Sequence, residues 1–312
     1  MISKKTSHIK SGAHPLLRSY AIRVIYTLAL LMVFTMGTQA HSSDNKHKDA
    51  SYFERQDRFQ SIDGQRLRSL EVLFSEWLAA ARSFTEGERI VDGFQVSEMG
   101  EGIQRLSDID DRGWGHFFHA SQRSSSTLLQ APHQFYDLRT GKIAMALFER
   151  GVGKALAMNS AHRYTYGKSL AETDWAHVPV SPLNAFTRAF MNSQPDAIVV
   201  QIHGYAEKNR KSPASRQADV IISSGQRWPH PKMLSLAACL QQTTDWQILR
   251  YPLDVGELGG TTNVQGQLMN SLGNPQFIHL ELSSRLRKVL AHDEAALYDL
   301  AECIQSITPG AE

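Results

Sequence analysis

Residues 128–137 of the chain have the sequence LLQAPHQFYD. An apolar run of strand character stops at Pro132, His133 follows at once, and Asp137 stands four residues after the histidine. A side chain placed directly after a buried strand lies at the mouth of a sheet, where metal hydrolases often present their first ligands. The segment therefore predicts a buried strand that ends in a candidate metal ligand, His133.

A second apolar run ends in the same way. Residues 197–204 have the sequence AIVVQIHG, so that His203 closes the run and Gly204 follows it. Glycine permits close backbone approach and an unusual turn, which suits a residue beside a cleft. Two strand ends that each carry a histidine predict one shared metal site.

Short apolar runs alternate with helix-like segments from Phe94 onward. This alternation predicts an α/β fold with a mainly parallel, mixed sheet, in which ligands bind beyond the carboxyl ends of the strands. Strands are expected over residues 115–120, 126–131, 154–159, 197–203, 218–224, 246–251 and 277–282. Helices are expected over residues 64–83, 140–150, 182–192, 231–242 and 284–306.

The N-terminus has the pattern of an export signal. Five basic residues precede an uncharged, mostly apolar stretch over residues 24–36, and Thr38-Gln39-Ala40 has the small-x-small form of a cleavage site. We expect a signal peptide over 1–40, a polar linker over 41–56, and a single α/β domain with an N-terminal helical segment over 57–312. An uncleaved N-terminal anchor is the alternative. After cleavage, no further apolar run of spanning length remains, and a periplasmic or secreted protein is expected.

Bulk properties narrow the choice of partners. The chain has 312 residues, 33 of them basic and 31 acidic, and this near balance gives no case for nucleic acid. Cys239 and Cys303 are its two cysteines. An exported protein can oxidise such a pair, and two buried free thiols remain an equal alternative. Without a CxxC pair, metal binding is expected to depend on other donors.

Histidines and carboxylates are those other donors. A catalytic zinc takes about three protein ligands from His, Asp or Glu and keeps one open position. His133, Asp137 and His203 supply such a set. Asp137 can ligate directly or orient His133 from behind, and Glu149 is an alternative third ligand. A separate set is also open, with ligands His162, Asp174 and His177.

Glu281 is the candidate general base. In the sequence FIHLEL, residues 277–282, strand alternation places His279 and Glu281 on the same face. A carboxylate in an apolar strand is costly unless it is solvated, paired or used, and burial raises its pKa toward the range that proton transfer needs. The alternative is an ion pair of Glu281 with Arg285 or Arg287.

Further polar groups are candidates for substrate binding. Arginine holds a carboxylate by a two-point hydrogen bond, and a polar, glycine-rich segment over residues 256–274 is long enough to be a functional loop. The substrate-binding candidates are Arg139, Asn159, Arg163, Thr262 and Asn263.

The order of these motifs resembles a known group of enzymes. Pro132-His133 with Asp137, the segment 201–204 and the segment 280–282 are similar to the N-formylglutamate amidohydrolase and poly-gamma-glutamate hydrolase branches of the zinc carboxypeptidase-like fold. The resemblance spans roughly residues 90 to 290. The chain has His-x-x-x-Asp where the zinc carboxypeptidases have His-x-x-Glu.

The resemblance implies a three-layer α/β/α architecture, one zinc ion, and hydrolysis of an amide bond next to a carboxylate. It implies that His133, Asp137 and His203 hold the zinc, and that Glu281 moves the proton of the attacking water. Arg139 or Arg163 would clamp the carboxylate of a small-molecule or peptide substrate. The alternative from another class is a catalytically degenerate module that binds acidic peptides or cell-wall fragments.

Overall fold

The computed structural model describes residues 51–79, 89–90, 93–166 and 171–308. The expected signal peptide, residues 1–40, and most of the expected linker, residues 41–56, lie outside these ranges. The described part of that linker is ordered against the core, since Tyr52 is fully buried and its ring lies 5.5 Å from that of Phe118. The expected linker boundary at residue 56 is therefore too late. None of the described helices has the length and apolar character needed to span a membrane.

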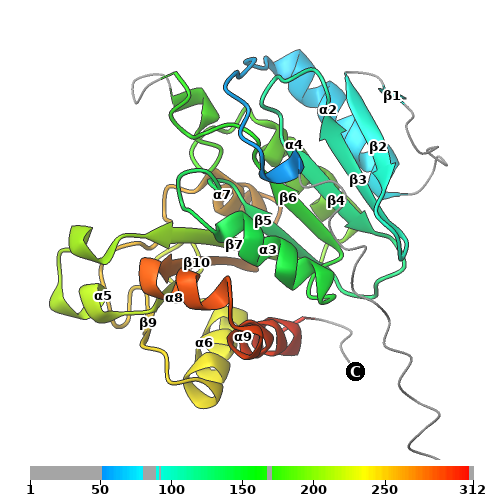
Figure 1. Ribbon diagram of the computed structural model, residues 1–312. Helices are drawn as coiled ribbons and strands as arrows, with labels where there is room; N and C mark the ends of the chain where they lie inside the picture. The colour runs from blue at the N-terminus through cyan, green and yellow to red at the C-terminus, as the bar shows by residue number, and fades with distance from the viewer. Residues whose placement is uncertain (1–50, 80–88, 91–92, 167–170, 309–312) are drawn as a thin grey trace, which may run out of the picture. The chain divides into compact units, whose positions relative to one another are not determined.

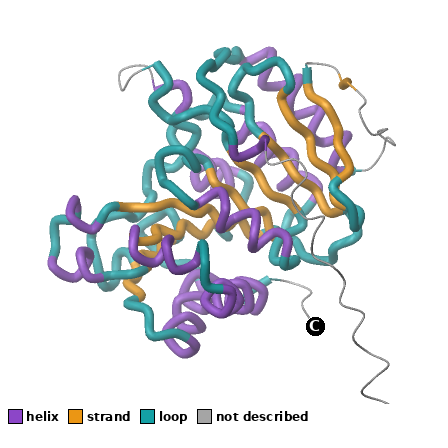
Figure 2. Tube along the Cα trace, viewed as in Figure 1, coloured by secondary structure: helices purple, strands orange, loops and turns teal. Residues whose placement is uncertain are grey.

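Ten strands form one sheet in the described part of the chain (Figures 1 and 2). Their spatial order is β1-β2-β3-β4-β6-β5-β7-β10-β8-β9. The strands are β1 (Arg89–Ile90), β2 (Phe94–Glu98), β3 (Ile103–Asp108), β4 (His116–Ala120), β5 (Thr127–Ala131), β6 (Ala155–Met158), β7 (Ile198–Tyr205), β8 (Val220–Ser223), β9 (Ile248–Arg250) and β10 (Phe277–Ser283).

The sheet is mixed, as expected, and its parallel strands form the centre. β6, β5, β7 and β10 are parallel neighbours, and β8 pairs in parallel with β9. β1 to β4, together with the β4–β6 and β8–β10 pairings, are antiparallel. Only residues 99–102 join β2 to β3, and a parallel crossover needs a dozen residues or more. The predicted site residues His133, His203 and Glu281 lie in or directly after the parallel central strands β5, β7 and β10.

Helices cover both faces of the sheet, which confirms the three-layer α/β/α fold (Figure 1). Consecutive strand residues alternate between the layers: Leu128 and Val199 pack in one apolar cluster, and Leu129 and Val200 pack in the other. The first layer contains α2 (Gly64–Leu78), α4 (Pro182–Ser193) and α7 (Val264–Ser271). The second contains α3 (Thr140–Glu149), α6 (Pro231–Thr243), α8 (Ser284–Leu290) and α9 (Glu294–Ser306).

The long helix expected over residues 284–306 is instead two helices. α8 ends at Leu290, and Asp293 begins α9 by accepting hydrogen bonds from the backbone N–H groups of Ala295 at 3.0 Å and Ala296 at 3.1 Å. An aspartate that caps a helix in this way favours a new N-terminus over continued helix.

A disulfide bond joins Cys239 of α6 to Cys303 of α9. The two residues are 64 positions apart in the sequence, so the bond closes a long loop and links two helices of the same layer. The structure thereby decides between the disulfide and the pair of free thiols.

Candidate metal centre

His133 and Asp137 are placed by the turn that follows β5. Pro132 ends the strand, and the backbone N–H of Asp137 donates to the carbonyl oxygen of His133 at 2.8 Å. This one turn brings the carboxylate over the ring, with Asp137 Oδ2 3.6 Å from His133 Nδ1. Both side chains are buried.

His203 reaches the same place from the neighbouring strand. β5 and β7 are parallel, with Gln130 opposite Gln201, so His203 extends past the end of β5 beside His133. The two rings lie 5.0 Å apart, and His203 Nδ1 lies 3.3 Å from Asp137 Oδ2. The structure thus brings the three predicted ligands together.

The donor set fits a zinc ion. Bonds of 2.0–2.2 Å in a tetrahedron place ligand atoms roughly 3.3–3.6 Å apart. Asp137 Oδ2 has these spacings to the two imidazole nitrogens, and all three ligand atoms lie within 4.8 Å of one another. Two imidazoles and one carboxylate, all buried, are a donor set that catalytic zinc sites use.

The outer nitrogen of each histidine is held by an acceptor. His133 Nε2 donates to Asp174 Oδ1 at 2.8 Å, and His203 Nε2 donates to Gln201 Oε1 at 2.7 Å. These bonds hold Nε2 of each ring and leave each Nδ1 facing the shared point. Burial opposes the charged form of His133, but hydrogen bonds to Asp137 and Asp174 outweigh it and raise its pKa, so a zinc ion bound there would displace the proton on Nδ1. Burial lowers the pKa of His203 to about 4, so that its ring is neutral near pH 7 and available as a ligand.

Asp174 was predicted, in the alternative set with His162 and His177, to be a metal ligand, but the structure gives it other partners. It accepts from His133, from His177 Nδ1 at 3.0 Å and from Arg163, whereas His162 Nδ1 accepts from the Tyr164 backbone N–H. No candidate metal cluster found among the described residues contains His162, Asp174 or His177. Asp174 is therefore the outer partner of His133, a role that the sequence interpretation missed.

Glu149, the other candidate for third ligand, lies at the C-terminal end of α3. It is not among the residues that line the pocket around the histidines. The turn after β5 therefore favours Asp137 as the carboxylate of the cluster.

We expect Asp174→Asn to weaken zinc binding by about 10–100-fold, because the charge that orients His133 is lost while the shape of the side chain is kept. The zinc dissociation constant can be measured by titration against a competing chelator. Asp254→Asn, which changes a carboxylate paired with Arg250 away from the site, is the matched control. An unchanged dissociation constant for Asp174→Asn would contradict this role.

Glu281 faces the cluster from β10. This strand is parallel to β7, and its register sets Glu281 opposite His203 and His279 opposite Gln201. The His279 ring lies 4.6 Å from that of His203. Glu281 Oε2 and His279 Nδ1 are buried without a hydrogen-bond partner in the described chain. Both groups are therefore available to a ligand.

The alternative ion pair of Glu281 does not form. Arg287 donates to the carbonyl oxygens of Leu138 and Tyr205, both at 3.0 Å, and to that of Ser283 at 3.4 Å. Arg285 pairs with Asp219. The guanidinium of Arg287 lies so close to Gly204 that a Cβ there would be 2.2 Å from Nη1, which explains the glycine after His203.

In the metal-free protein, burial and then the nearby Asp137 raise the pKa of Glu281 to about 8 from an ordinary 4.5. The folded state thus binds the Glu281 proton more tightly than the unfolded state does. The protonated carboxyl group therefore contributes fully to stability below its pKa in the unfolded chain, and this contribution is lost as the pH rises through its pKa in the folded protein. We therefore expect the free energy of unfolding of metal-free Glu281→Gln to rise, relative to that of the wild type, by about 1 kcal/mol for each pH unit between about pH 5 and 8. Urea unfolding in a chelator tests this, and parallel pH profiles would contradict it.

The cluster opens into a pocket of about 490 Å³ beyond the C-terminal ends of β5, β7 and β10. Of the predicted substrate-binding residues, Arg163, Thr262 and Asn263 line it. Asn159 does not, since its Oδ1 accepts from the Gln134 backbone N–H and its Nδ2 donates to a carbonyl oxygen. Arg139 begins α3 with a φ of 79° and also lies outside the pocket lining.

Arg210, Arg287 and His279 line the pocket as well, and the sequence interpretation gave them no role there. Arg210 lies in the segment EKNRK, residues 207–211, which has the composition of a solvated surface. His279 shares a strand face with Glu281, and this alternation was the one signal that pointed to it.

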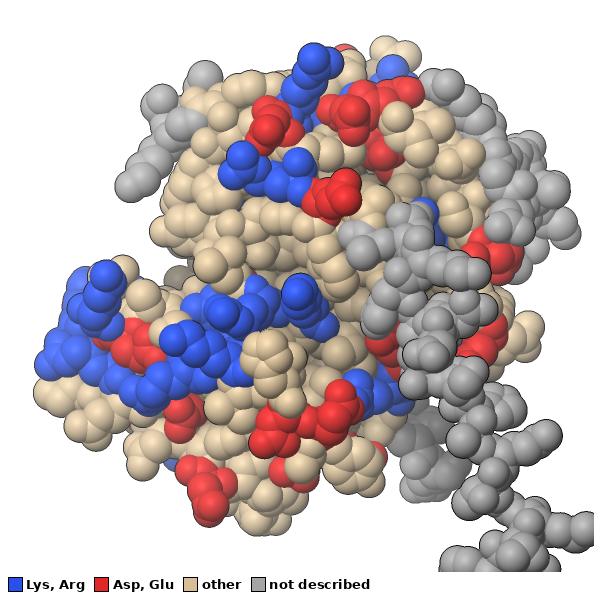
Figure 3. Space-filling view, viewed as in Figure 1, with Lys and Arg blue, Asp and Glu red and all other residues tan. Residues whose placement is uncertain are grey.

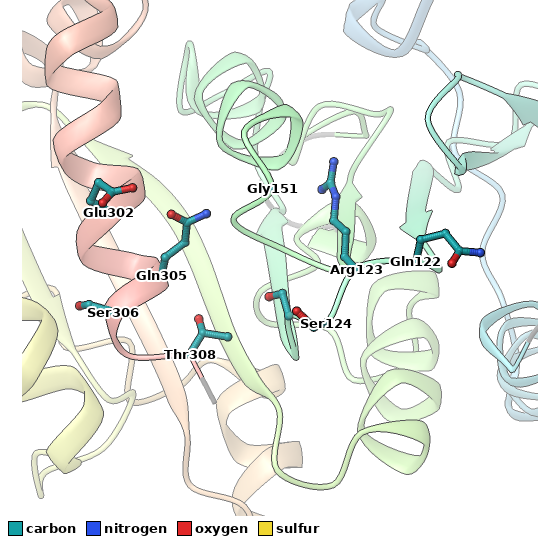
Figure 4. Close-up of a pocket in the computed structure, with 9 residues that line it drawn as sticks. Gln122, Arg123, Ser124, Gly151, Glu302, Gln305, Ser306 and Thr308 are labelled. Carbon is teal, nitrogen blue, oxygen red and sulfur yellow. The ribbon is translucent and has the colours of Figure 1, made fainter. Parts of the chain in front are cut away.

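A second cavity, of about 580 Å³, lies at the opposite ends of the parallel strands, beside the C-terminal turn of α9 (Figure 4). Arg123 is its cation, and Arg123 Nη1 donates to the carbonyl oxygens of Phe148 at 2.6 Å and Gly153 at 2.9 Å. Neither candidate metal cluster of the described residues touches this cavity. The chemistry-bearing side chains are thus gathered in the first pocket.

No protein-family model matches the chain, and no curated protein sequence matches it. Solved structures are similar to it in fold. The N-formylglutamate amidohydrolase of Ralstonia eutropha JMP134 is 13% identical, with 62% of this chain and 96% of that chain covered and a TM-score of 0.41. A bacteriophage poly-gamma-glutamate hydrolase is 12% identical, with 59% and 84% covered and a TM-score of 0.35. A gene product of Agrobacterium tumefaciens is 12% identical, with 59% and 91% covered and a TM-score of 0.44. At these identities the similarity concerns the fold alone.

Proposed function

We propose that this protein is an exported, zinc-dependent hydrolase that cleaves an amide bond next to a carboxylate. The observation that carries the proposal is the meeting of His133 Nδ1, His203 Nδ1 and Asp137 Oδ2 around one point, with an acceptor fixed behind each histidine. Histidines that ligate a metal almost always donate the other ring N–H to an acceptor in this way.

The residues around the proposed metal point can carry out the separate steps of an amide hydrolysis. Zinc bound there would lower the pKa of a water molecule and polarise the substrate carbonyl. Glu281, which is buried and whose Oε2 has no hydrogen-bond partner among the described residues, takes the proton from the water and returns it to the leaving nitrogen.

Arg163 is the candidate clamp for the substrate carboxylate. Its guanidinium pairs with Asp174, and Nη1 lies 3.3 Å from His133 Nδ1, so it stands at the edge of the metal point. The rings of Tyr136 and Tyr164 flank it at 5.2 and 5.0 Å. Packing of this kind holds the planar group in position for a two-point hydrogen bond with a carboxylate.

Export is supported by the disulfide between Cys239 and Cys303, because such bonds persist in oxidising compartments such as the periplasm and the extracellular space. The basic and apolar pattern of residues 1–40 agrees with this proposal.

Metal analysis and a substrate screen on the purified chain test the function. We expect about one zinc per chain, and hydrolysis of N-formyl-glutamate or of a γ-glutamyl peptide that a chelator abolishes and added zinc restores. Matched compounds in which the carboxylate next to the scissile amide is replaced by an amide are expected to react more slowly. A purified chain that binds no divalent metal would contradict the proposal.

A further inference from the structure

Arg210 is a pocket arginine whose hydrogen-bond donors are largely unused. It follows η3 (Glu207–Asn209), in the loop after the strand that carries His203. Its Nε is buried and has no partner among the residues that the structure describes. Its contact with Glu257 joins Nη1 to Oε2 at 3.5 Å, the limit of a hydrogen bond. A buried N–H without an acceptor costs free energy, which an anionic ligand would recover.

Glu257 forms only a long ion pair with this arginine, through Oε2 and Arg210 Nη1 at 3.5 Å. Its carboxylate accepts from the backbone N–H groups of Lys211 at 3.1 Å and Ser212 at 3.2 Å, and from the hydroxyl of Ser215. Burial opposes ionisation of Glu257, but these hydrogen bonds outweigh it and lower the pKa. The lone pairs of Glu257 are therefore directed mainly at residues 211–215, and the fork of Arg210 remains open to the pocket.

The other two arginines of the pocket lining are engaged. Arg163 pairs with Asp174 beside the metal point, and Arg287 makes three hydrogen bonds to backbone carbonyl oxygens. Arg210 and Arg163 each have a buried Nε without a partner in the described chain. Arg210 differs because its ion pair, from Nη1 to Glu257 Oε2 at 3.5 Å, is longer than any hydrogen bond or ion pair that holds Arg163 or Arg287 within the described residues.

Positive charge continues outward from Arg210. Lysines and arginines gather over α5 (Pro213–Gln217) and α8 in Figure 3. We call this the basic surface; it is made of the exposed residues Lys208, Lys211, Arg216, Arg285 and Lys288. Charge of one sign at the mouth of a cleft raises the local concentration of oppositely charged molecules.

We propose that Arg210 forms a second carboxylate subsite, so that the substrate carries at least two carboxylates, one held at Arg163 and the other at Arg210. The first carboxylate rests on the proposed function, whereas the second rests on the geometry of Arg210. The guanidinium binds this carboxylate through two parallel N–H···O hydrogen bonds. The basic surface attracts the acidic ligand and adds no specific contact.

Binding of matched acids tests the subsite without any hydrolysis. Calorimetric titrations compare glutarate with pentanoate and adipate with hexanoate, since each pair differs by one carboxylate and the two lengths allow for the spacing of the subsites. We expect one or both dicarboxylates to bind at least about tenfold more tightly than its partner. Arg210→Gln is expected to abolish this preference and to leave binding of the monocarboxylates unchanged.

Two further variants separate the two-point hydrogen bond of Arg210 from the effect of positive charge alone. Arg210→Lys retains the charge without the fork, and it is expected to keep only part of the preference. Lys211→Gln removes an exposed neighbouring charge and is expected to keep all of it. Thermal melting of each variant verifies folding, and Arg210→Lys carries the test if Arg210→Gln does not fold.

Three results would overturn the subsite: no preference for dicarboxylates in the wild type, equal weakening of both acids by Arg210→Gln, or the same effect from Lys211→Gln. The titrations are made on the zinc-loaded and on the metal-free protein. If zinc binding or hydrolysis fails while Arg210 still governs the preference, the proposed reaction is wrong and the subsite stands.

Discussion

Replacing His203 with alanine is expected to strip zinc from the protein. The substitution removes one of three ligand atoms and also the acceptor-bound ring that fills the space between His133 and His279. Loss of an outer partner alone typically weakens a metal site by about 10–100-fold, so loss of a ligand is expected to weaken it by more than about a hundredfold. Elemental analysis after dialysis against a weak chelator measures the loss.

The control is His292→Ala, which removes an exposed histidine of the turn between α8 and α9. It is expected to retain about one zinc per chain. Full zinc occupancy in His203→Ala, with a melting curve like that of the wild type, would mean that the metal point is wrongly placed.

Glu281→Gln is expected to retain zinc and to lose hydrolysis. Glutamine has the shape of glutamate but cannot accept and return a proton, and a positioned acid or base typically contributes about 10²–10⁴-fold to rate. Because Glu281 is outside the set His133, Asp137 and His203, zinc content should stay near that of the wild type. Turnover of a γ-glutamyl peptide, measured beside zinc content on the same preparation, separates the two effects.

The second metal-competent group, which combines His203 with His279 and Glu281, makes this measurement decisive. A large loss of zinc in Glu281→Gln would show that Glu281 ligates the metal instead of moving a proton. Unchanged binding of acidic peptides in a protein that never hydrolyses them would favour the non-catalytic binding module.

The sequence predicted the strand ends at which the candidate site residues lie. Apolar runs that end at Pro132-His133 and at His203-Gly204 are visible because a buried central strand is a continuous apolar run, bounded by turn residues. The face shared by His279 and Glu281 follows from the two-residue period of a strand. Each of these inferences needs only neighbours within a few positions.

The secondary-structure prediction was wrong or incomplete where a local sequence pattern is compatible with two structures. The stretch from 284 to 306 has helical periodicity throughout, and the cap at Asp293 decides that it is two helices. The strands before residue 115 pair as antiparallel neighbours, and their short, partly exposed sequences gave too little signal.

Tertiary structure alone decided which polar groups share the site. Asp174 lies 41 positions from His133, and Arg210 was indistinguishable in sequence from a solvated surface arginine. Their roles depend on which strand ends are neighbours and on which donors are already satisfied, and these follow from long-range packing. The chain thus encodes the ligand types and strand ends locally, whereas parallel pairing of β5, β7 and β10 sets the distances between them.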